Sequence, residues 1–250
     1  MTSRAPPTIF SATRRRQRSE RAARSGERWL IEAMAEDVLD RLAFMRPDPG
    51  RALVVGDLSG SLARELGSKG WNTITPDPVS FNEEQPIAGG PYDLAISIAR
   101  LDTVNDLPAA LLHLRGALSK GGIAICAMPG AGSLPVLRQV MLGADPDRPA
   151  PRIHPQIDSR AGTALLERAG FSRQVVDAYT LTARYRSLAR LVGDLRAQGL
   201  NSALASRGPF LGKAALARAR AAFEALRDGD VDKDGGVVET FEILTLTGWR

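Results

Sequence analysis

The chain has 250 residues, of which 44% are hydrophobic and 24% charged, with 24 glycines and 16 prolines. This is the balance of an ordinary globular protein, and it excludes wholesale disorder, collagen and low-complexity architectures. The net charge of +5 comes from the start of the chain, because residues 1–28 hold eight arginines against Glu20 and Glu27. Residues 29–250 are left with 25 basic and 26 acidic side chains. We therefore expect a basic N-terminal arm over residues 1–28 and a near-neutral folded domain over residues 29–250.

The chain has few cysteine and histidine side chains that could bind a metal ion. The single cysteine, Cys126, cannot form an intramolecular disulfide or a cysteine-based zinc cluster, and His113 and His154 are the only histidines. No apolar run reaches the roughly 18–20 residues of a membrane span, and the N-terminus lacks the apolar centre of a secretory signal. The sequence thus predicts a cytoplasmic protein with no metal site and no transmembrane segment.

The first half of the chain predicts alternating helices and strands. Residues 10–28 have no apolar face and indicate a solvated helix or a flexible arm. Over residues 29–45, apolar residues at three- and four-residue spacing predict an amphipathic helix. The elements expected next are a strand at 52–55, a helix at 61–69, strands at 73–75 and 93–99, a helix at 105–118 and a strand at 123–128. Strands that alternate with helices at this spacing are typical of a parallel sheet with right-handed crossovers.

The second half of the chain is richer in predicted helices. Helices are expected at 161–169, 188–199 and 213–227, and the alternating run at 237–247 predicts a final strand, antiparallel at the sheet edge. The fold class is therefore α/β: a doubly wound, mostly parallel Rossmann-like sheet with an antiparallel C-terminal edge strand and a helical insertion at about 185–230.

The turn after the first predicted strand is the best candidate for a binding site. Ligands of doubly wound sheets bind beyond the carboxyl ends of the strands. The turn here runs from Gly56 to Gly60, a G-x-x-x-G, and the second strand ends at Asp77, 21 residues after Gly56. An acid at that spacing can accept hydrogen bonds from a ribose diol. The alternative is that Gly56 and Gly60 merely permit a strand-to-helix turn.

Several segments resemble those of a known family. Three runs look like those of the class I S-adenosylmethionine-dependent methyltransferases: LVVGDLSGSLA, PYDLAISI and VNDLPAALLHLRGALSKGGIAICAM. Five further segments point to a narrower branch of this family. They are the arginine-rich start IFSATRRRQRSERAA and the runs AMPGAGSLPVLR, PRIHP, YRSLARLVGDLRAQGLNSAL and TFEILTLTGW. That branch contains the malonyl-carrier-protein methyltransferase of biotin synthesis and the mitochondrial complex I assembly factor 5. The C-terminal motifs favour the assembly-factor side.

The resemblance implies a methyltransferase fold and a site for S-adenosylmethionine. It implies methyl transfer to a small-molecule or protein acceptor, in which the protein mainly aligns the reacting atoms. No residue stands out as catalytic. The cofactor-binding candidates are Gly56, Asp57, Gly60, Asp77, Asn82 and Glu83. Gly56 and Gly60 match the glycines of the family's first motif, and Asp77 matches the family's ribose-binding acid.

Three departures from the family pattern predict a degenerate cofactor site. Val54 and Leu58 stand where the family has an acid and a central glycine, and only 14 residues separate Asp77 from Tyr92. A strand or the helix before it must therefore be shortened or missing, since a crossover needs a dozen or more residues. Asp102 and Thr103 replace a His-Trp pair. The alternative function is a non-catalytic or atypical assembly protein, of the respiratory complex I type, which binds a protein partner.

Other patterns are weaker. Asp230, Asp232 and Asp234 have the first ligand spacings of an EF-hand, but Phe241 stands where its bidentate glutamate belongs, which favours a plain loop. A structural role is expected for both histidines, although His154 is the better functional candidate, and Cys126 is expected to be a buried small hydrophobe. The arginine run lacks interleaved aromatics, so nucleic-acid binding is not expected.

Overall fold

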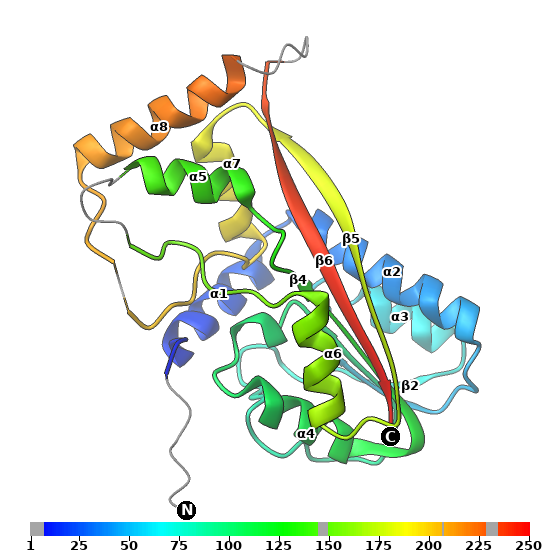
Figure 1. The fold of residues 1–250 in the computed structure, drawn as a ribbon. Helices are drawn as coiled ribbons and strands as arrows, with labels where there is room; N and C mark the ends of the chain where they lie inside the picture. The colour runs from blue at the N-terminus through cyan, green and yellow to red at the C-terminus, as the bar shows by residue number, and fades with distance from the viewer. Residues whose placement is uncertain (1–7, 145–149, 207, 229–234) are drawn as a thin grey trace, which may run out of the picture.

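The computed structural model describes residues 8–144, 150–206, 208–228 and 235–250. In this part of the chain a six-stranded sheet has the order β2-β1-β3-β4-β6-β5 (Figure 1). The strands are β1 (Arg51–Val55), β2 (Asn72–Ile74), β3 (Tyr92–Ile98), β4 (Leu118–Pro129), β5 (Arg173–Tyr185) and β6 (Val237–Trp249). The first four are parallel to one another, and β6 is antiparallel to both of its neighbours. The predicted α/β class with a mostly parallel sheet is confirmed.

The last two strands differ in one respect from the expectation. The final strand, β6, is antiparallel as predicted, but it lies one strand inside the sheet, because β5 pairs along its other side over residues 173–185. No strand was expected at β5. Its residues alternate between exposed and half-buried and carry several polar side chains, so the segment lacks the continuous apolar run that marks the inner strands.

Helices cover both faces of the sheet (Figure 1). They are α1 (Ala12–Arg24), α2 (Trp29–Met45), α3 (Ser61–Ser68), α4 (Leu107–Ala117), α5 (Pro135–Ala144), α6 (Ser159–Arg168), α7 (Leu188–Ala197) and α8 (Lys213–Asp228), with a short 3-10 turn, η1 (Leu101–Thr103). One apolar core lies between the sheet and α2 and α3, and a second lies between the sheet and α4 and α6.

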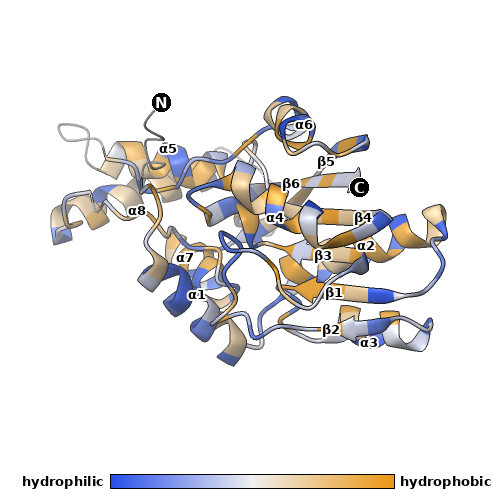
Figure 2. Ribbon diagram, turned by 90° about the horizontal axis from the view of Figure 1, so that it is seen from below, coloured by the Kyte–Doolittle hydropathy of each residue, from blue (hydrophilic) through white to orange (hydrophobic). Residues whose placement is uncertain are grey.

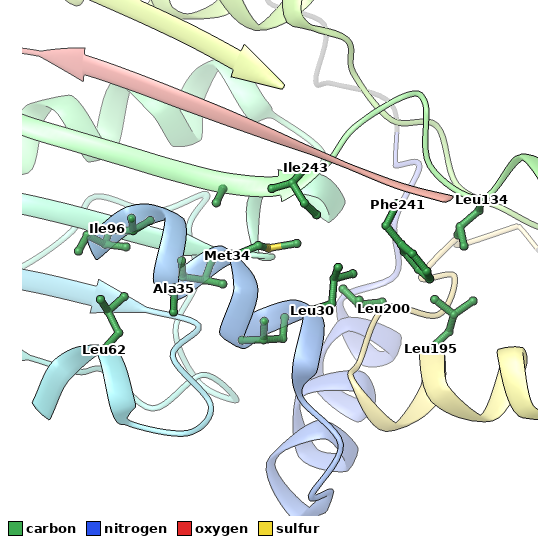
Figure 3. Packing of buried hydrophobic residues seen from close by; sticks show 14 of the residues in the cluster. Leu30, Met34, Ala35, Leu62, Ile96, Leu134, Leu195, Leu200, Phe241 and Ile243 are labelled. Carbon is green, nitrogen blue, oxygen red and sulfur yellow. The ribbon is translucent and has the colours of Figure 1, made fainter. Parts of the chain in front are cut away.

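The larger core explains why α2 forms where its periodicity predicts. Leu30, Met34 and Val38 recur on one face of the helix and are fully buried. They belong to one apolar cluster with Ile96 and Ile243 of the sheet, and Figure 3 shows Leu30 and Met34 of α2 within it. Burying apolar area of this kind is the main favourable contribution to folding, at about 25 cal/mol per Å². The same core continues past the end of the sheet to α7, so it joins the helical end of the molecule to the strands.

The carboxyl ends of the parallel strands face α1, α5, α7 and α8, which gather at one end of the molecule (Figure 2). The long strand β6 extends into this region and fixes α5 there. Its Glu239 accepts hydrogen bonds from the backbone N–H groups of Val136 and Leu137, at 3.2 and 2.8 Å. These are donors that a helix N-terminus cannot satisfy internally. Any ligand at the strand ends would therefore meet these helices.

The segment between β2 and β3 is as short as the sequence indicated. Residues 75–91, all of them described, contain neither a helix nor a strand, and the sheet ends at β2. Since β1 pairs with β3 directly, the predicted loss of a strand or helix in this segment is confirmed.

The basic arm is not free in solution. Its helix α1 begins at a serine cap, with the Ser11 hydroxyl accepting from the N–H of Arg14, and Phe10 forms an isolated antiparallel bridge with Leu204. Arg18 and Ala22 are the buried residues of the helix. Because the sequence shows no apolar face, the burial of an arginine here could not be read from periodicity. The division into an arm and a domain 29–250 stays a proposal.

No helix in the described part of the chain is both long and apolar enough to cross a membrane.

Candidate functional site

A narrow cleft lies where β1 and β3 end. Gly56 follows β1 with φ +89°, and a Cβ at this position would overlap the backbone carbonyl oxygen of Ile98 at the end of β3. Only glycine combines this backbone conformation with so close an approach. The edge predicted to hold a ligand is therefore present, with α1 lying across it.

The side chain of Arg100 fills much of the cleft. It follows β3 and reaches over Gly56, and its Nε donates to Glu83 Oε1 at 2.6 Å. Its Nη1 donates to the Ser19 hydroxyl of α1 at 2.9 Å, and its Nη2 donates to the carbonyl oxygen of Phe81 at 3.2 Å. The guanidinium thus joins three segments that are distant in sequence.

A second arginine closes the cleft from the side of the arm. Arg15 of α1 donates to Glu83 Oε2 at 2.7 Å. The Glu83 side chain is only 5% exposed, so one buried carboxylate accepts from two guanidinium groups. Charge-assisted bonds of this length are among the stronger polar contacts in proteins. We name Arg15, Glu83 and Arg100 the cleft triad.

Behind the triad lies a second buried group of charges. Arg18 Nη2 lies 3.7 Å from Asp102 Oδ2, and His154 Nε2 lies 3.3 Å from the same oxygen. Burial alone would raise the pKa of Asp102, but the close approach of His154 and the charge of Arg18 hold the pKa below its ordinary value. Burial lowers the pKa of Arg18. Asp102 is therefore a carboxylate whose charge depends on its two neighbours.

This second group is incompletely satisfied. Arg18 Nη1, Asp102 Oδ1 and His154 Nδ1 are buried with no hydrogen-bond partner among the described residues. A buried polar atom without a partner costs about 1–3 kcal/mol, and such atoms are rare in native structures without a functional reason. The closed arrangement of α1 therefore carries a free-energy cost.

Little space remains between these side chains. The cavity lined by Gly56, Leu58, Arg100 and α1 has a volume of about 40 Å³, which suffices for a few water molecules. Pockets for small ligands and cofactors measure about 300–1,000 Å³. In this arrangement the cleft is closed to a molecule of cofactor size.

The structure brings two of the six predicted cofactor residues to the cleft. Gly56 and Glu83 border it. Asp57 instead accepts from the Ala63 N–H at 2.9 Å, which satisfies a donor in the first turn of α3. Gly60 is the N-cap residue of that helix, with φ +67°. The alternative role of these turn residues, forming the strand-to-helix connection, accounts for Asp57 and Gly60.

Asp77 and Asn82 serve local turns. The Asp77 carboxylate accepts from the Val79 N–H and the Ser80 hydroxyl, at 3.1 and 2.9 Å, and these bonds, the backbone one foremost, lower its pKa. The Asn82 side-chain oxygen accepts from the Glu84 N–H at 3.1 Å. Both side chains are exposed. A cofactor role for either stays a prediction.

The sequence did not single out Arg100, Arg15 or Arg18 as site residues. Arg100 stands directly after a predicted buried strand, at the edge where ligands bind, and that position was the available signal. The two arm residues occur in a run of arginines whose members look alike. Asp102 and His154 were noted separately, as a family departure and as a loop candidate, and only the fold places them 3.3 Å apart.

The remaining candidates are structural or lie elsewhere. No group of three or more metal-ligating side chains occurs within the described ranges. Residues 229–234, which include the aspartates of the rejected EF-hand pattern, lie outside those ranges. His113 is half-buried on α4.

Cys126 should resist thiol reagents in the native protein. It is 1% exposed on β4, and burial raises the pKa of its thiol to about 12, so almost no thiolate is present at pH 8. We expect an aromatic disulfide reagent at pH 8 to label no thiol in buffer and one thiol per chain in 6 M guanidinium. Fast labelling in buffer would contradict the burial of this strand.

Comparisons with known proteins identify the family of this fold. Residues 26–175 match a family model described as a methyltransferase domain. The chain is 27% identical to human arginine-hydroxylase NDUFAF5, mitochondrial, over 97% of this chain and 77% of that protein. It is 28% identical to a malonyl-[acyl-carrier protein] O-methyltransferase of Gallionella capsiferriformans, over 85% of this chain and 81% of that protein.

A solved structure shows the same fold at low sequence identity. It is a methyltransferase candidate from Bacillus halodurans, with a TM-score of 0.53, 12% identity and coverage of 84% of this chain and 97% of that one. The family model spans more than half of the chain, including β1, β3, β4 and the strand ends at Gly56 and Arg100, but not α1. The chain therefore belongs to the methyltransferase domain family.

Proposed function

We propose that this chain is an S-adenosylmethionine-dependent methyltransferase whose cofactor cleft is closed at rest by its own helix α1. S-adenosylmethionine is the cofactor that the family supports. As arranged, the described residues do not fit it: the cavity holds about 40 Å³, and Asp77 is engaged in a turn. Binding therefore requires α1 to leave the cleft.

The observation that carries the proposal is the way α1 is held. Only Arg18 and Ala22 of this helix are buried, and its remaining contacts with the cleft are ion pairs and hydrogen bonds. Segments with few buried apolar contacts open at low free-energy cost. The unpartnered buried atoms of Arg18 and Asp102 lower that cost further, because they regain water on opening.

We propose only the general class of the molecule that accepts the methyl group. The relatives act, by name, on an arginine and on a malonyl carrier protein, and we propose a small-molecule or protein acceptor and a cytoplasmic location for this chain.

Replacing Arg15 by alanine tests whether α1 closes the cofactor cleft. Arg15→Ala removes the ion pair from α1 to Glu83 and leaves the Glu83–Arg100 pair in place. The apparent affinity of a site that is open only part of the time rises with the open fraction. We expect calorimetric titration with S-adenosylmethionine to give a dissociation constant about tenfold lower for the variant, a gain of about 1.4 kcal/mol.

Arg16→Ala is the matched control. Arg16 is the next residue on α1, 59% exposed and paired only with Glu20 of the same helix. Its replacement should leave the affinity unchanged. The proposal fails if S-adenosylmethionine binds neither protein more tightly than about 1 mM, the equivalent of about −4.1 kcal/mol, or if Arg15→Ala weakens binding.

A non-catalytic assembly protein is the second candidate. The observations that favour it are the missing element between β2 and β3 and the side chain of Leu58 on the cleft wall. In that case the cleft triad is a permanent structural core, and α1 does not open. Failure of the Arg15→Ala variant to bind S-adenosylmethionine, with its fold intact by circular dichroism, would support this candidate.

A further inference from the structure

A deep apolar pocket lies away from the cofactor cleft, between α5, α7 and the segment that follows α7. Figure 1 shows these helices together at one end of the molecule, with α8 alongside. The pocket has a volume of about 510 Å³, within the range of small-molecule sites. Its walls are mostly leucine, isoleucine, valine and methionine side chains, among them Leu137, Met141, Leu188, Val192 and Leu200.

A polar, basic groove adjoins the apolar pocket. The groove, of about 490 Å³, shares Arg196, Asn201 and Ser202 with the apolar pocket and adds Arg14 and Arg21 of α1. Neither set of lining residues includes an aspartate or glutamate.

Three of the four arginines that line the groove have no acidic partner among the described residues, and the fourth, Arg18, pairs with Asp102. Among the described residues, no carboxylate lies within 4.0 Å of a side-chain nitrogen of Arg14, Arg21 or Arg196. This contrasts with Arg15 and Arg18 of the same helix, which both have acidic partners. Guanidinium groups gathered without acids suit phosphate, which presents several acceptor oxygens and carries nearly two charges at pH 7.

We propose that the pocket and groove together bind a single-chain amphiphile that carries a phosphate head. The hydrocarbon chain lies in the apolar pocket, and the phosphate lies in the groove against Arg14, Arg21 and Arg196. The site is distinct from the cofactor cleft, although α1 contributes to both and Arg18 lines both, so the phosphate groove is complete only while α1 is seated. Asp102 stands between them, since it contacts His154 on the pocket side and Arg18 on the cleft side.

Gly193 offers a way to fill the pocket without removing any contact. It lines the pocket from α7, and a Cβ added there meets no atom within 4 Å. Gly193→Phe therefore adds a ring at the pocket wall and does not strain the backbone. Gly116→Phe on α4 is the matched control, because a Cβ there also meets nothing and the residue lies outside the pocket.

The test is isothermal titration of the full chain with dodecyl phosphate below its critical micelle concentration. Dodecanol supplies the chain alone, and inorganic phosphate supplies the head alone. We expect dodecyl phosphate to bind at least tenfold more tightly than either. Gly193→Phe and Arg196→Gln should each weaken binding tenfold or more, and Gly116→Phe and Arg168→Gln, an exposed site at the end of α6, should not.

Two results would overturn the proposal and indicate nonspecific hydrophobic adsorption instead. One is that dodecanol and dodecyl phosphate bind with equal affinity. The other is that Gly193→Phe and Arg196→Gln both bind dodecyl phosphate as tightly as the wild type does. Binding only to anionic lipid vesicles, with none to monomeric dodecyl phosphate, would also overturn it and favour a membrane surface. Neither result depends on S-adenosylmethionine, so failure here is distinct from failure of the proposed function.

Discussion

Replacing Asp102 by alanine should lower the free energy of unfolding by up to about 3–5 kcal/mol, the limit being the free energy that releasing α1 from the cleft costs. The Asp102 side chain is 1% exposed and that of its partner Arg18 is 6% exposed. Without the carboxylate, the guanidinium of Arg18 would stay buried next to Arg15 and Arg100, whose charges also disfavour it. Urea unfolding monitored by circular dichroism at pH 7 measures the loss.

The double variant Arg18→Met/Asp102→Ala separates the charge from the packing. Replacing both members of a buried ion pair by apolar groups is often neutral or stabilising, so the double variant should recover most of the stability that the single variant loses. If the double variant is less stable than Asp102→Ala, the cost comes from the lost volume and not from an unpaired charge.

The pH dependence of the same variant follows from the lowered pKa of Asp102. A carboxyl whose folded-state pKa lies below its unfolded value stabilises the protein above the unfolded pKa, which is near 3.9. That stabilisation is lost as the pH falls through the lower, folded-state pKa. The stability difference between wild type and Asp102→Ala should therefore be full at pH 6 and shrink below about pH 4.

Gly56→Ala should lower the free energy of unfolding by about 2–5 kcal/mol. The position has φ +89°, which an alanine adopts at a cost of about 1–2 kcal/mol. The new Cβ would also overlap the carbonyl oxygen of Ile98, and overpacking adds typically 1–3 kcal/mol. Thermal or urea unfolding gives the value directly.

Gly60→Ala is the comparison within the same turn. Its φ is +67°, but a Cβ there meets only Nη1 of Arg64, at 3.2 Å, and that flexible side chain can move. We expect a loss of about 1 kcal/mol. Equal losses at Gly56 and Gly60 would contradict the close approach of β1 and β3 that defines the cleft.

The elements that the sequence predicts best are those with a continuous or strictly periodic apolar pattern. The helix at 29–45 and the strands at 52–55 and 123–128 are confirmed within a few residues, because their buried faces dictate the spacing of leucine, isoleucine and valine. β5 was missed since it lies at the sheet edge with one side open to solvent. Its polar face weakens the pattern that marks a strand.

The cleft was harder to predict than the fold. Gly56 and the shortened segment before Tyr92 were readable, because both depend on local chain geometry. The pairing of Arg15 and Arg100 on Glu83 depends on contacts across 68 and 17 residues. The eight arginines of residues 1–28 give no sign of which side chains turn inward, since charge and helical propensity are the same for all of them.

The arm can dock only late in the synthesis of the chain. Its anchoring bonds join Ser11 to Ala203, Arg14 to Leu204 and Arg18 to Gly199, so the partners of α1 are translated nearly two hundred residues after it. β1, β3 and β4 are complete by residue 129. Domains begin to fold during translation at about 5–20 residues per second. The nascent chain therefore spends several seconds with its strand ends bare, before the residues that seat the arm have emerged.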